Sequence, residues 1–302
     1  MISSDRTRCG FVTVLGPTNA GKSTLVNALV GTKVSIVSPK VQTTRFKIRG
    51  ILNQGETQLI FIDTPGIFKP TRKLDKAMIQ NAWEDSETSD VCLLVIDALK
   101  GMNSAVESML QTLRKEKHAV SLVLNKIDLL TKEELLPLID DLNKAYPFEQ
   151  TFLISALKNQ GLDDLKSYLI NKMPFSPWFF PDNQLTDISD RLFSAEMTRE
   201  KIFLYLQQEL PYSIYVTTQS FSETDEAITI KQDIIVERPS QKTIILGKNG
   251  QMIKKIGMAS RRELTALFGK KVNLFLFVQV NKNWALEKQA YTQMGLNFDV
   301  KN

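Results

Sequence analysis

One short stretch near the start of the chain, GPTNAGKS at residues 16–23, constrains the fold more than any other feature. It follows the apolar run GFVTVLG (10–16), which predicts a strand, and it opens KSTLVNALVG, which predicts a helix ending at Gly31. Glycines permit a tight turn in which loop N–H groups and a helix N-terminus face phosphate groups. The strand–loop–helix context separates this pattern from an accidental glycine turn. The sequence therefore predicts a nucleotide-binding α/β domain.

Each part of this loop has a chemical role. The Lys22 ammonium supplies positive charge for the β- and γ-phosphates, and the Ser23 hydroxyl is a ligand that Mg²⁺ accepts. Because the backbone of the whole loop follows the phosphates, we expect nucleotide contacts from Gly16, Pro17, Thr18, Asn19, Ala20, Gly21, Lys22, Ser23 and Thr24.

Two later motifs indicate which base is bound. NKID begins at Asn125, after an apolar run, and ends at Asp128. A carboxylate there accepts two hydrogen bonds from guanine N1–H and the 2-amino group, whereas adenine offers no donors at that edge and would leave the carboxylate unpaired. Lys126 can cover the ring and Asn125 can brace the loop. The triplet Ser155, Ala156 and Leu157 follows another apolar run, and the Ala156 N–H is expected to meet guanine O6.

A third motif, DTPG, comprises Asp63, Thr64, Pro65 and Gly66. Asp63 is expected to hold Mg²⁺ through water, and the Gly66 N–H to contact the γ-phosphate. Thr43 and Thr44 are both candidates to complete the Mg²⁺ shell, with a slight preference for Thr44. The predicted catalytic set is Lys22, Thr44, Asp63 and Gly66.

The residue after this motif is unusual for a nucleotide hydrolase. Many GTPases place there a glutamine that orients water, but this chain has Ile67, which cannot hydrogen-bond. We therefore expect slow intrinsic turnover supported by Mg²⁺, Lys22 and backbone amides. Arg45 is interpreted as a surface charge rather than an arginine finger, and His118 as a residue outside every functional loop.

The distribution of apolar runs predicts the architecture. Strands alternate with helices in the first half, which favours a mostly parallel sheet covered on both faces, with FKIRGILN and TQLIFID as a hairpin. The stretch KMPFSPWFFPDNQLTD then carries three prolines, and Trp178, Phe179 and Phe180 are expected to pin it to a domain. The predicted organisation is a nucleotide-binding domain over 1–173, a linker over 174–182 and a second domain over 183–302.

The second domain is expected to contain a small three-stranded sheet backed by helices. The predicted elements are a helix over 190–209, strands over 213–219 and 227–237, helices over 251–256 and 259–268, a strand over 271–280 and a closing helix over 282–293. Residues 242–271 carry eight Lys or Arg against Glu263 alone, a net charge of +7 around a second glycine loop, GKNG at 247–250. This local charge favours a polyanionic partner.

In their combination and order, the motifs resemble those of known GTPases. Residues 10–172 resemble a translation-factor-class GTPase domain, and the stretches GPTNAGKST, QTTR, DTPGI and KLDKAM resemble the Era family of bacterial GTPases. Downstream, AEMTREKIFLYLQQELPYS and IILGKNGQMIKKIG resemble the same family. A G-x-x-G loop within an αββααβ order is similar to a type II KH domain, whose loop clamps an RNA backbone.

The resemblance implies a GTP/GDP switch that hydrolyses GTP with Mg²⁺ and binds the 3′ end of small-subunit ribosomal RNA during maturation of the 30S subunit. It also implies a potassium ion (K⁺) near Asn19, a monomeric state and peripheral contact with the inner membrane. The expected RNA-binding residues are Gly247, Lys248, Asn249, Gly250, Lys254, Lys255, Arg261 and Arg262.

Two alternatives remain open. The chain could be a constitutive RNA-binding protein with a vestigial nucleotide site, although intact Lys22, Ser23 and Asp128 argue against this. It could also be a GTPase component of tRNA modification, which would need a further domain that no residues supply. Cysteines are too few for a disulfide framework, no signal peptide begins the chain, and the run VCLLVIDAL is too short to span a bilayer, so a cytoplasmic protein is expected.

Overall fold

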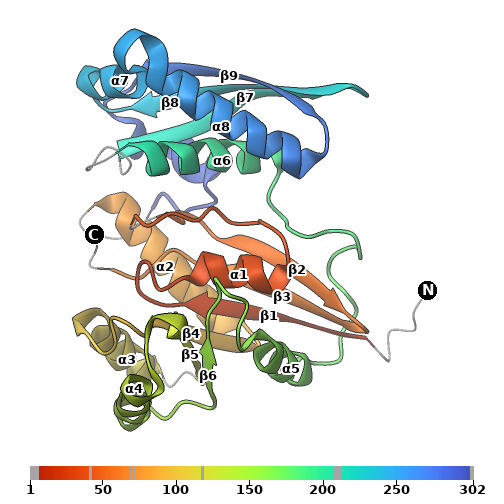
Figure 1. Cartoon of the computed structure of the whole chain (residues 1–302), viewed down its shortest axis with the longest axis vertical. Coiled ribbons are helices and arrows are strands. Elements are labelled where there is room, and N and C mark those ends of the chain that lie inside the picture. The colour runs from red at the N-terminus through yellow and green to blue at the C-terminus, as the bar shows by residue number, and fades with distance from the viewer. Residues whose placement is uncertain are drawn as a thin grey trace. The chain divides into compact units, whose positions relative to one another are not determined.

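A computed structural model describes residues 7–40, 43–68, 70, 72–116, 119–206 and 213–299 (Figure 1). These residues form two compact units. The first contains the chain up to Ser35, Thr44–Asp187 and the residues from Met294 onward, and the second contains Ile36–Thr43 and Ile188–Gln293. Residues 183–187 thus group with the first unit, and the domain boundaries expected from the sequence stay a prediction. His118 and Gln42 lie outside the described residues.

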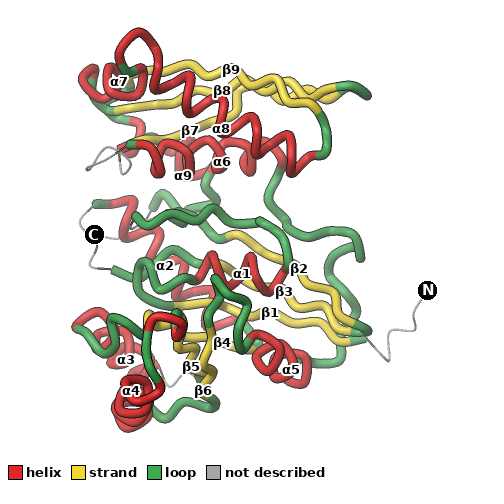
Figure 2. Tube along the Cα trace, in the orientation of Figure 1, coloured by secondary structure: helices red, strands yellow, loops and turns green. Residues whose placement is uncertain are grey.

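The first unit is built on a six-stranded sheet in the order β2-β3-β1-β4-β5-β6 (Figure 2). The hairpin strands β2 and β3 are antiparallel, as predicted, and the other neighbouring pairs are parallel. Every residue of β3, β4 and β5 is buried, which is typical of a parallel sheet with both faces covered. The strands are β1 (Arg8–Leu15), β2 (Ile48–Gln54), β3 (Thr57–Asp63), β4 (Val91–Asp97), β5 (Ser121–Asn125) and β6 (Thr151–Ile154).

Helices cover the two faces of this sheet with separate apolar clusters. Leu25 of α1 and Leu165 of α5 belong to one cluster, whereas Ala82 of α2, Leu113 of α3 and Leu142 of α4 belong to the other. The predicted α/β class with a mostly parallel sheet is therefore confirmed. The helices are α1 (Lys22–Val30), α2 (Lys73–Thr88), α3 (Ser104–Glu116), α4 (Lys132–Ala145) and α5 (Leu162–Lys172).

The proline-rich segment after α5 packs on the first unit through one buried side chain. Gln58 accepts hydrogen bonds at Oε1 from the N–H groups of Phe179 and Phe180, at 2.9 and 3.0 Å, and donates through Nε2 to the Phe180 carbonyl at 2.9 Å. The Phe179 ring lies 5.3 Å from that of Phe11, and Trp178 Nε1 donates to the Glu56 carbonyl. The three aromatic residues therefore hold this segment against β1, β3 and the turn before β3, as the sequence indicated.

The second unit is a three-stranded sheet, in the order β7-β8-β9, with helices packed against it. Strands β7 and β8 are antiparallel, and the crossover through two helices makes β9 parallel to β8. The elements are α6 (Asp190–Tyr205), β7 (Ile214–Glu223), β8 (Ala227–Val236), α7 (Pro239–Leu246), α8 (Gln251–Phe268), β9 (Lys271–Val280) and α9 (Lys288–Gln293).

The helices around the second glycine loop differ from the prediction. A helix, α7, precedes the loop at 239–246, where the sequence analysis expected none, and Pro239 occupies its first turn. The two helices expected at 251–256 and 259–268 are one continuous helix, α8. Gly257 does not interrupt it because Ile256, Ser260 and Leu264, spaced four apart, are all buried on one face.

Other boundaries also shift. Helix α6 ends at Tyr205 rather than at residue 209, and the closing segment consists of a short turn at Trp284–Leu286 followed by α9. Among the residues that the structure describes, no helix has both the length and the apolar character needed to traverse a lipid bilayer.

Candidate functional site

The nucleotide motifs follow the carboxyl ends of parallel strands in the first unit. Gly16 follows β1, Asp63 ends β3, Asn125 ends β5 and Ser155 follows β6. Parallel strands place their carboxyl ends at one edge of the sheet, which is where ligands bind in open α/β folds. The structure therefore brings together the four motifs that the sequence analysis singled out.

The first glycine loop needs its glycines for conformation and for close approach. Gly16 and Gly21 have φ angles of 151° and 95°. A Cβ atom at Gly16 would lie 2.2 Å from the Val95 carbonyl oxygen, and one at Gly21 would lie 2.2 Å from Asn125 Nδ2. Since real Cβ atoms do not approach so closely, only glycine fits at either position.

Lys22 lies at the start of α1 and is 6% exposed. Its Nζ donates to the carbonyls of Gly16 and Pro17, each at 3.0 Å, so the side chain folds back over its own loop. Burial lowers the pKa of Lys22 to about 8, and the nearby Asp63 carboxylate opposes this shift. Phosphate oxygens entering the loop would supply the negative charge that a buried ammonium lacks.

The Asn125 side chain joins three loops. Its Nδ2 donates to the Ala20 carbonyl at 2.9 Å, and its Oδ1 accepts from the N–H groups of Lys126 at 2.8 Å and Ala156 at 3.0 Å. With 2% exposure, Asn125 has little access to water that could replace these bonds. The predicted bracing role of Asn125 thus has a defined geometry.

The Ala156 N–H takes part in this network. In this structure it donates to Asn125 Oδ1, and its contact with guanine O6 stays a prediction. Ser155 is fully buried and pairs with Gln160, whereas Leu157 is 76% exposed at the rim. Of the three residues, Ala156 therefore bonds directly to the NKID loop.

One acidic residue in this network is absent from the residues predicted from the sequence. Asp97, at the end of β4, forms a 2.7 Å ion pair with Lys126 Nζ, which also donates to the Asn19 carbonyl at 2.9 Å. Its position at a strand terminus beside the other motifs was a signal that could have found it. The pair fixes the Lys126 stem, while Asp128 is exposed on the following turn, Ile127–Leu129.

Three oxygen-bearing side chains converge beside the loop. Ser23 Oγ lies 2.9 Å from Thr44 Oγ1, and Thr44 Oγ1 lies 3.5 Å from Asp63 Oδ2. Asp63 is fully buried, and its Oδ1 has no hydrogen-bond partner among the described residues. Burial raises the pKa of Asp63, although the nearby Ser23 hydroxyl and Lys22 ammonium oppose this shift. A hard divalent cation would satisfy such a carboxylate, so Ser23, Thr44 and Asp63 fit Mg²⁺.

The two neighbouring threonines face different partners. Thr43 Oγ1 contacts Ser38 Oγ and donates to the Lys40 carbonyl, both at 2.7 Å, whereas Thr44 points toward Ser23.

Arg45, interpreted from the sequence as a surface charge, is 3% exposed, so that interpretation is wrong. Thr44, Arg45 and Phe46 are buried one after another, which a local sequence pattern does not reveal.

The third motif lies against the first. The Ile67 N–H donates to the Gly16 carbonyl at 3.1 Å, and Thr64 Oγ1 donates to the Val14 carbonyl at 2.8 Å. A Cβ atom at Gly66 would lie 2.7 to 3.0 Å from Thr18. Pro65 is buried, and Thr24 lies in α1. The DTPG backbone is therefore packed directly on the phosphate loop.

The second glycine loop, in the second unit, has different surroundings. Gly247, Asn249 and Gly250 have φ angles of 70°, 50° and 73°, and the loop joins α7 to α8. A Cβ atom at Gly247 would lie 2.7 Å from Met252 Cβ, but at Gly250 it would meet nothing within 4 Å. One side of the turn is thus packed and the other is open to a ligand.

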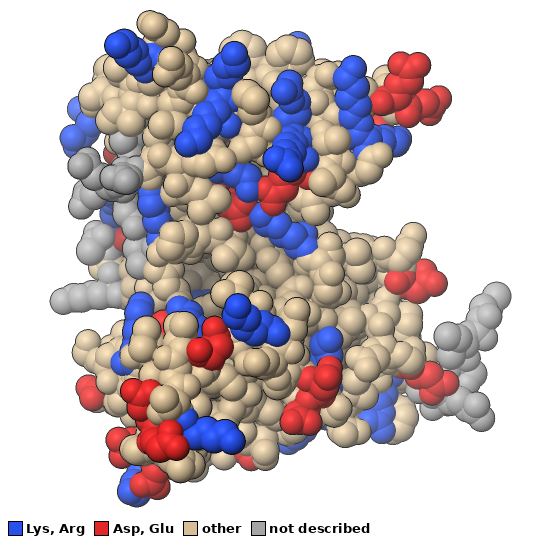
Figure 3. Space-filling model, in the orientation of Figure 1, with Lys and Arg blue, Asp and Glu red and all other residues tan. Residues whose placement is uncertain are grey.

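Helix α8 carries its basic residues on the solvent side. Figure 3 shows Lys and Arg side chains along the part of the second unit that contains α8. Lys255 Nζ lies 4.4 Å from the Tyr205 ring centroid of α6, whereas the backbone at Gly257 faces Leu276 of β9. All of the predicted RNA-binding side chains on this helix are exposed: Lys254, Lys255, Arg261 and Arg262.

The geometry defines a P-loop GTPase unit joined to a small unit with a GxxG loop between two helices. Two family profiles match the chain: "50S ribosome-binding GTPase" over residues 11–126 and "KH domain" over residues 209–285. These matches confirm both predicted domain types.

Comparison with whole proteins identifies the family. The chain is 49% identical over 293 residues to GTPase Era of Agrobacterium fabrum, covering 97% of this chain and 92% of that protein. It is 47% identical to GTPase Era of Brucella suis, covering 97% and 94%. The chain therefore belongs to the Era family of GTPases, and it hydrolyses GTP.

Solved structures agree. A crystal structure of Era in complex with MgGDPNP and nucleotides 1506–1542 of 16S ribosomal RNA matches with a TM-score of 0.91 and 38% identity, covering 96% of this chain and 99% of that chain. A structure of Aquifex aeolicus Era bound to GDP·AlF₄⁻ matches with the same TM-score, identity and coverage. The nucleotide in the former includes Mg²⁺, consistent with the predicted cofactor.

Replacing Asp128 by asparagine should change the base preference without affecting folding. The carboxylate is exposed, and its loss removes the acceptor for two guanine donors, so GTP affinity should fall by about 100-fold or more. Xanthosine triphosphate, which carries a carbonyl where guanine has its amino group, should bind the variant better than GTP. Competition binding measures both. Asp164→Asn, at an exposed aspartate of α5, is the control, and an unchanged preference in Asp128→Asn would refute the assignment.

Proposed function

We propose that this protein is a GTP-driven switch that binds the 3′ end of 16S ribosomal RNA during assembly of the small ribosomal subunit. The main support for the proposal is that the loop between α1 and β2 contributes residues to both units. Residues 36–43 belong to the second unit, whereas the next residue, Thr44, belongs to the nucleotide site. A change in nucleotide at Thr44 is therefore transmitted along a continuous backbone into the unit that bears the GxxG loop.

The nucleotide site supplies positioning and charge. Lys22 and the loop amides hold the β- and γ-phosphates, Asp128 selects guanine, and the Gly66 N–H contacts the γ-phosphate. Ser23, Thr44 and Asp63 hold Mg²⁺, which when bound neutralises phosphate charge. Thr44 rather than Thr43 is the ligand, because the Thr43 hydroxyl is bonded within its own loop.

Hydrolysis is slow in this proposal. Ile67 offers no hydrogen bond to the attacking water, and its N–H is used by Gly16. Turnover therefore depends on preorganised donors around the phosphates. A slow reaction suits a switch, since the GTP-bound state persists long enough to be read by the RNA-binding unit.

In the RNA-binding unit, as in the nucleotide site, a glycine turn lets the protein backbone approach phosphates closely, but here the phosphates are those of an RNA strand. Gly247, Lys248, Asn249 and Gly250 form the turn that approaches the RNA backbone. Exposed basic side chains of α8 supply counter-charge along the strand: Lys254, Lys255, Arg261 and Arg262. The relatives' complex with 16S ribosomal RNA supports this assignment. On the family likeness we also propose a cytoplasmic protein with peripheral contact to the inner membrane.

A potassium ion beside Asn19 is a separate proposal. Asn19 occupies the loop with φ 62°, and its carbonyl is fixed by Lys126. GTP hydrolysis should be faster in potassium than in sodium buffer at equal ionic strength, because a monovalent cation adds charge beside the phosphates. Asn19→Ala should abolish the difference. Equal wild-type rates in the two buffers would contradict a potassium site.

Gly250→Asp should weaken RNA binding, assigned to the GxxG loop, without affecting GTP binding, assigned to the loop at residues 16–23. Asp tolerates the left-handed conformation, and no atom obstructs a Cβ at this position, so the fold should survive. The added carboxylate repels phosphates, and RNA affinity should fall by about tenfold or more, whereas GTP affinity should stay unchanged. Filter binding and nucleotide titration measure these quantities.

Gly269→Asp is the matched control. Gly269 ends the same helix with φ 64° and equally free space, but lies outside the GxxG loop. It should retain more RNA affinity than Gly250→Asp. If Gly250→Asp instead weakened GTP binding in a folded protein, the division of labour between the two loops would be wrong.

A further inference from the structure

The loop between α1 and β2 leaves the first unit at a defined point. Asn27 of α1 accepts at Oδ1 from the N–H groups of Val34 and Ser35, at 2.9 Å each, and donates through Nδ2 to the Ser35 carbonyl at 2.8 Å. The next residue, Ile36, is 1% exposed and lies in an apolar cluster of the second unit with Phe193 and Leu264. Ile36 is therefore packed as part of that unit.

Polar contacts from α6 and from Leu206, the residue after it, hold three other residues of this segment, residues 36–43. Glu200 Oε1 accepts from the Val37 N–H at 2.8 Å. Arg199 Nη2 donates to the Thr43 carbonyl at 2.5 Å. Lys40 Nζ donates to the Leu206 carbonyl just beyond the helix. Helix α6 thus contacts the segment near its beginning and at its end, and the residue after the helix contacts its middle.

Arg199 is itself rigidly held. Its Nε donates to Glu196 Oε1 at 2.7 Å, its Nη2 pairs with Glu196 Oε2, and its guanidinium lies 5.1 Å from the Phe203 ring centroid. Arg199 is 1% exposed. A buried guanidinium fixed on one side by a carboxylate presents its remaining donors in a set direction. Here the Nη2 group donates to the Thr43 carbonyl.

We propose that Arg199 is a positioning residue for the nucleotide site, acting through the backbone at Thr43 on the side chain of Thr44. Thr43 and Thr44 share a peptide bond, so fixing the Thr43 carbonyl limits where Thr44 Oγ1 can lie. That oxygen is 2.9 Å from Ser23 Oγ, beside Asp63. The inference rests on the proposed role of Thr44 in holding Mg²⁺, and it adds a second-unit residue to the machinery of the GTP-bound state.

Helix α6 is also tied to the basic helix. Lys201 Nζ pairs with Glu200 at 2.7 Å and with Glu263 of α8. Glu263 follows Arg261 and Arg262, the predicted RNA contacts. Helix α6 is thus bonded to the helix that carries the predicted RNA contacts.

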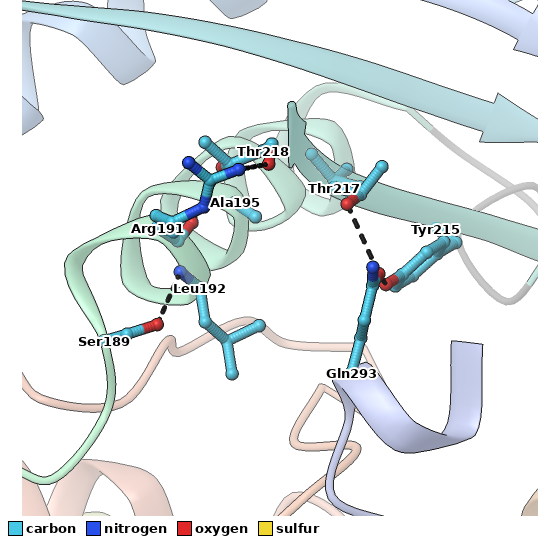
Figure 4. A pocket seen from close by; sticks show the side chains of 9 residues that line it. Ser189, Arg191, Leu192, Ala195, Tyr215, Thr217, Thr218 and Gln293 are labelled. Carbon is cyan, nitrogen blue, oxygen red and sulfur yellow. Dashed lines mark hydrogen bonds between the residues drawn. The ribbon is translucent and has the colours of Figure 1, made fainter. Parts of the chain in front are cut away.

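The test compares two arginines of the same helix. Arg199→Lys keeps the charge for Glu196, but one ammonium cannot reproduce the guanidinium fork to both partners. The control is Arg191→Lys: Arg191 Nη2 also donates to backbone carbonyls, of Thr218 at 2.6 Å and Gln219 at 2.8 Å, beside a pocket of about 210 Å³ within the second unit (Figure 4). Arg191 has no bond to the segment at 36–43 among the described contacts.

The readouts separate positioning from general destabilisation. Because Thr44 contributes only when a triphosphate is bound, Arg199→Lys should weaken binding of a non-hydrolysable GTP analogue with Mg²⁺ by about tenfold, while GDP affinity changes less than about twofold. The Mg²⁺ concentration at half-maximal analogue binding should rise. Arg191→Lys should change neither quantity, and thermal unfolding should confirm that both variants fold.

A double-mutant cycle with Thr44→Ala completes the test. If Arg199 acts through Thr44, Arg199→Lys should have no further effect in a Thr44→Ala background. Additive effects, or equal effects of Arg191→Lys, would overturn the inference and leave the proposed switch standing. If Thr44→Ala alone left analogue and Mg²⁺ binding unchanged, the Thr44 assignment itself would fail, and the inference with it.

A second variant tests the same contact without the risk that an unpaired buried charge destabilises the fold. Arg199→Met combined with Glu196→Leu removes the same contact to Thr43 without leaving either buried charge unpaired. It should reproduce the loss of analogue affinity seen with Arg199→Lys. A folded double variant with wild-type analogue affinity and Mg²⁺ dependence would overturn the proposal.

Discussion

The nucleotide site depends on one buried amide. The Asn125 side chain bonds the phosphate loop at Ala20, its own loop at Lys126 and the loop after β6 at Ala156. These loops follow three different strands, and no other side chain among the described contacts joins all three. Gly21 has to be glycine because Asn125 Nδ2 occupies the space of a side chain there. The same residue therefore fixes both the loop predicted to select guanine and the loop predicted to hold phosphate.

The two glycine loops share backbone conformations but differ in what surrounds them. The first is enclosed: Lys22 and Asp63 are buried beside it, and side chains at its glycines would collide with Val95 and Asn125. Such a site fits a single small ligand with defined charges. The second is open at Gly250 and flanked by exposed cations on α8. It fits a chain of phosphates that passes over the surface, since no wall limits the ligand's length.

Local sequence predicted the loops well and their tertiary partners poorly. Motif spacing identified the phosphate loop, NKID and DTPG, because each depends on residue types at fixed offsets behind apolar strands. Helix α7 was missed since PSQKTIIL lacks a clear apolar stripe, and α8 was divided at Gly257, although core contacts on both sides keep it continuous. The burial of Arg45 and the bond from Glu200 to Val37 had no local signal: the latter joins residues 163 positions apart.

In the proposed function, nucleotide state and RNA binding are linked through the loop that carries Thr44. This link is tested by the affinity of the full chain for a fragment from the 3′ end of 16S ribosomal RNA, in saturating GTP analogue with Mg²⁺ and in saturating GDP. We predict tighter RNA binding with the analogue and, by linkage, tighter analogue binding in the presence of RNA. Identical RNA affinities with the two nucleotides would contradict it and indicate a constitutive RNA-binding protein.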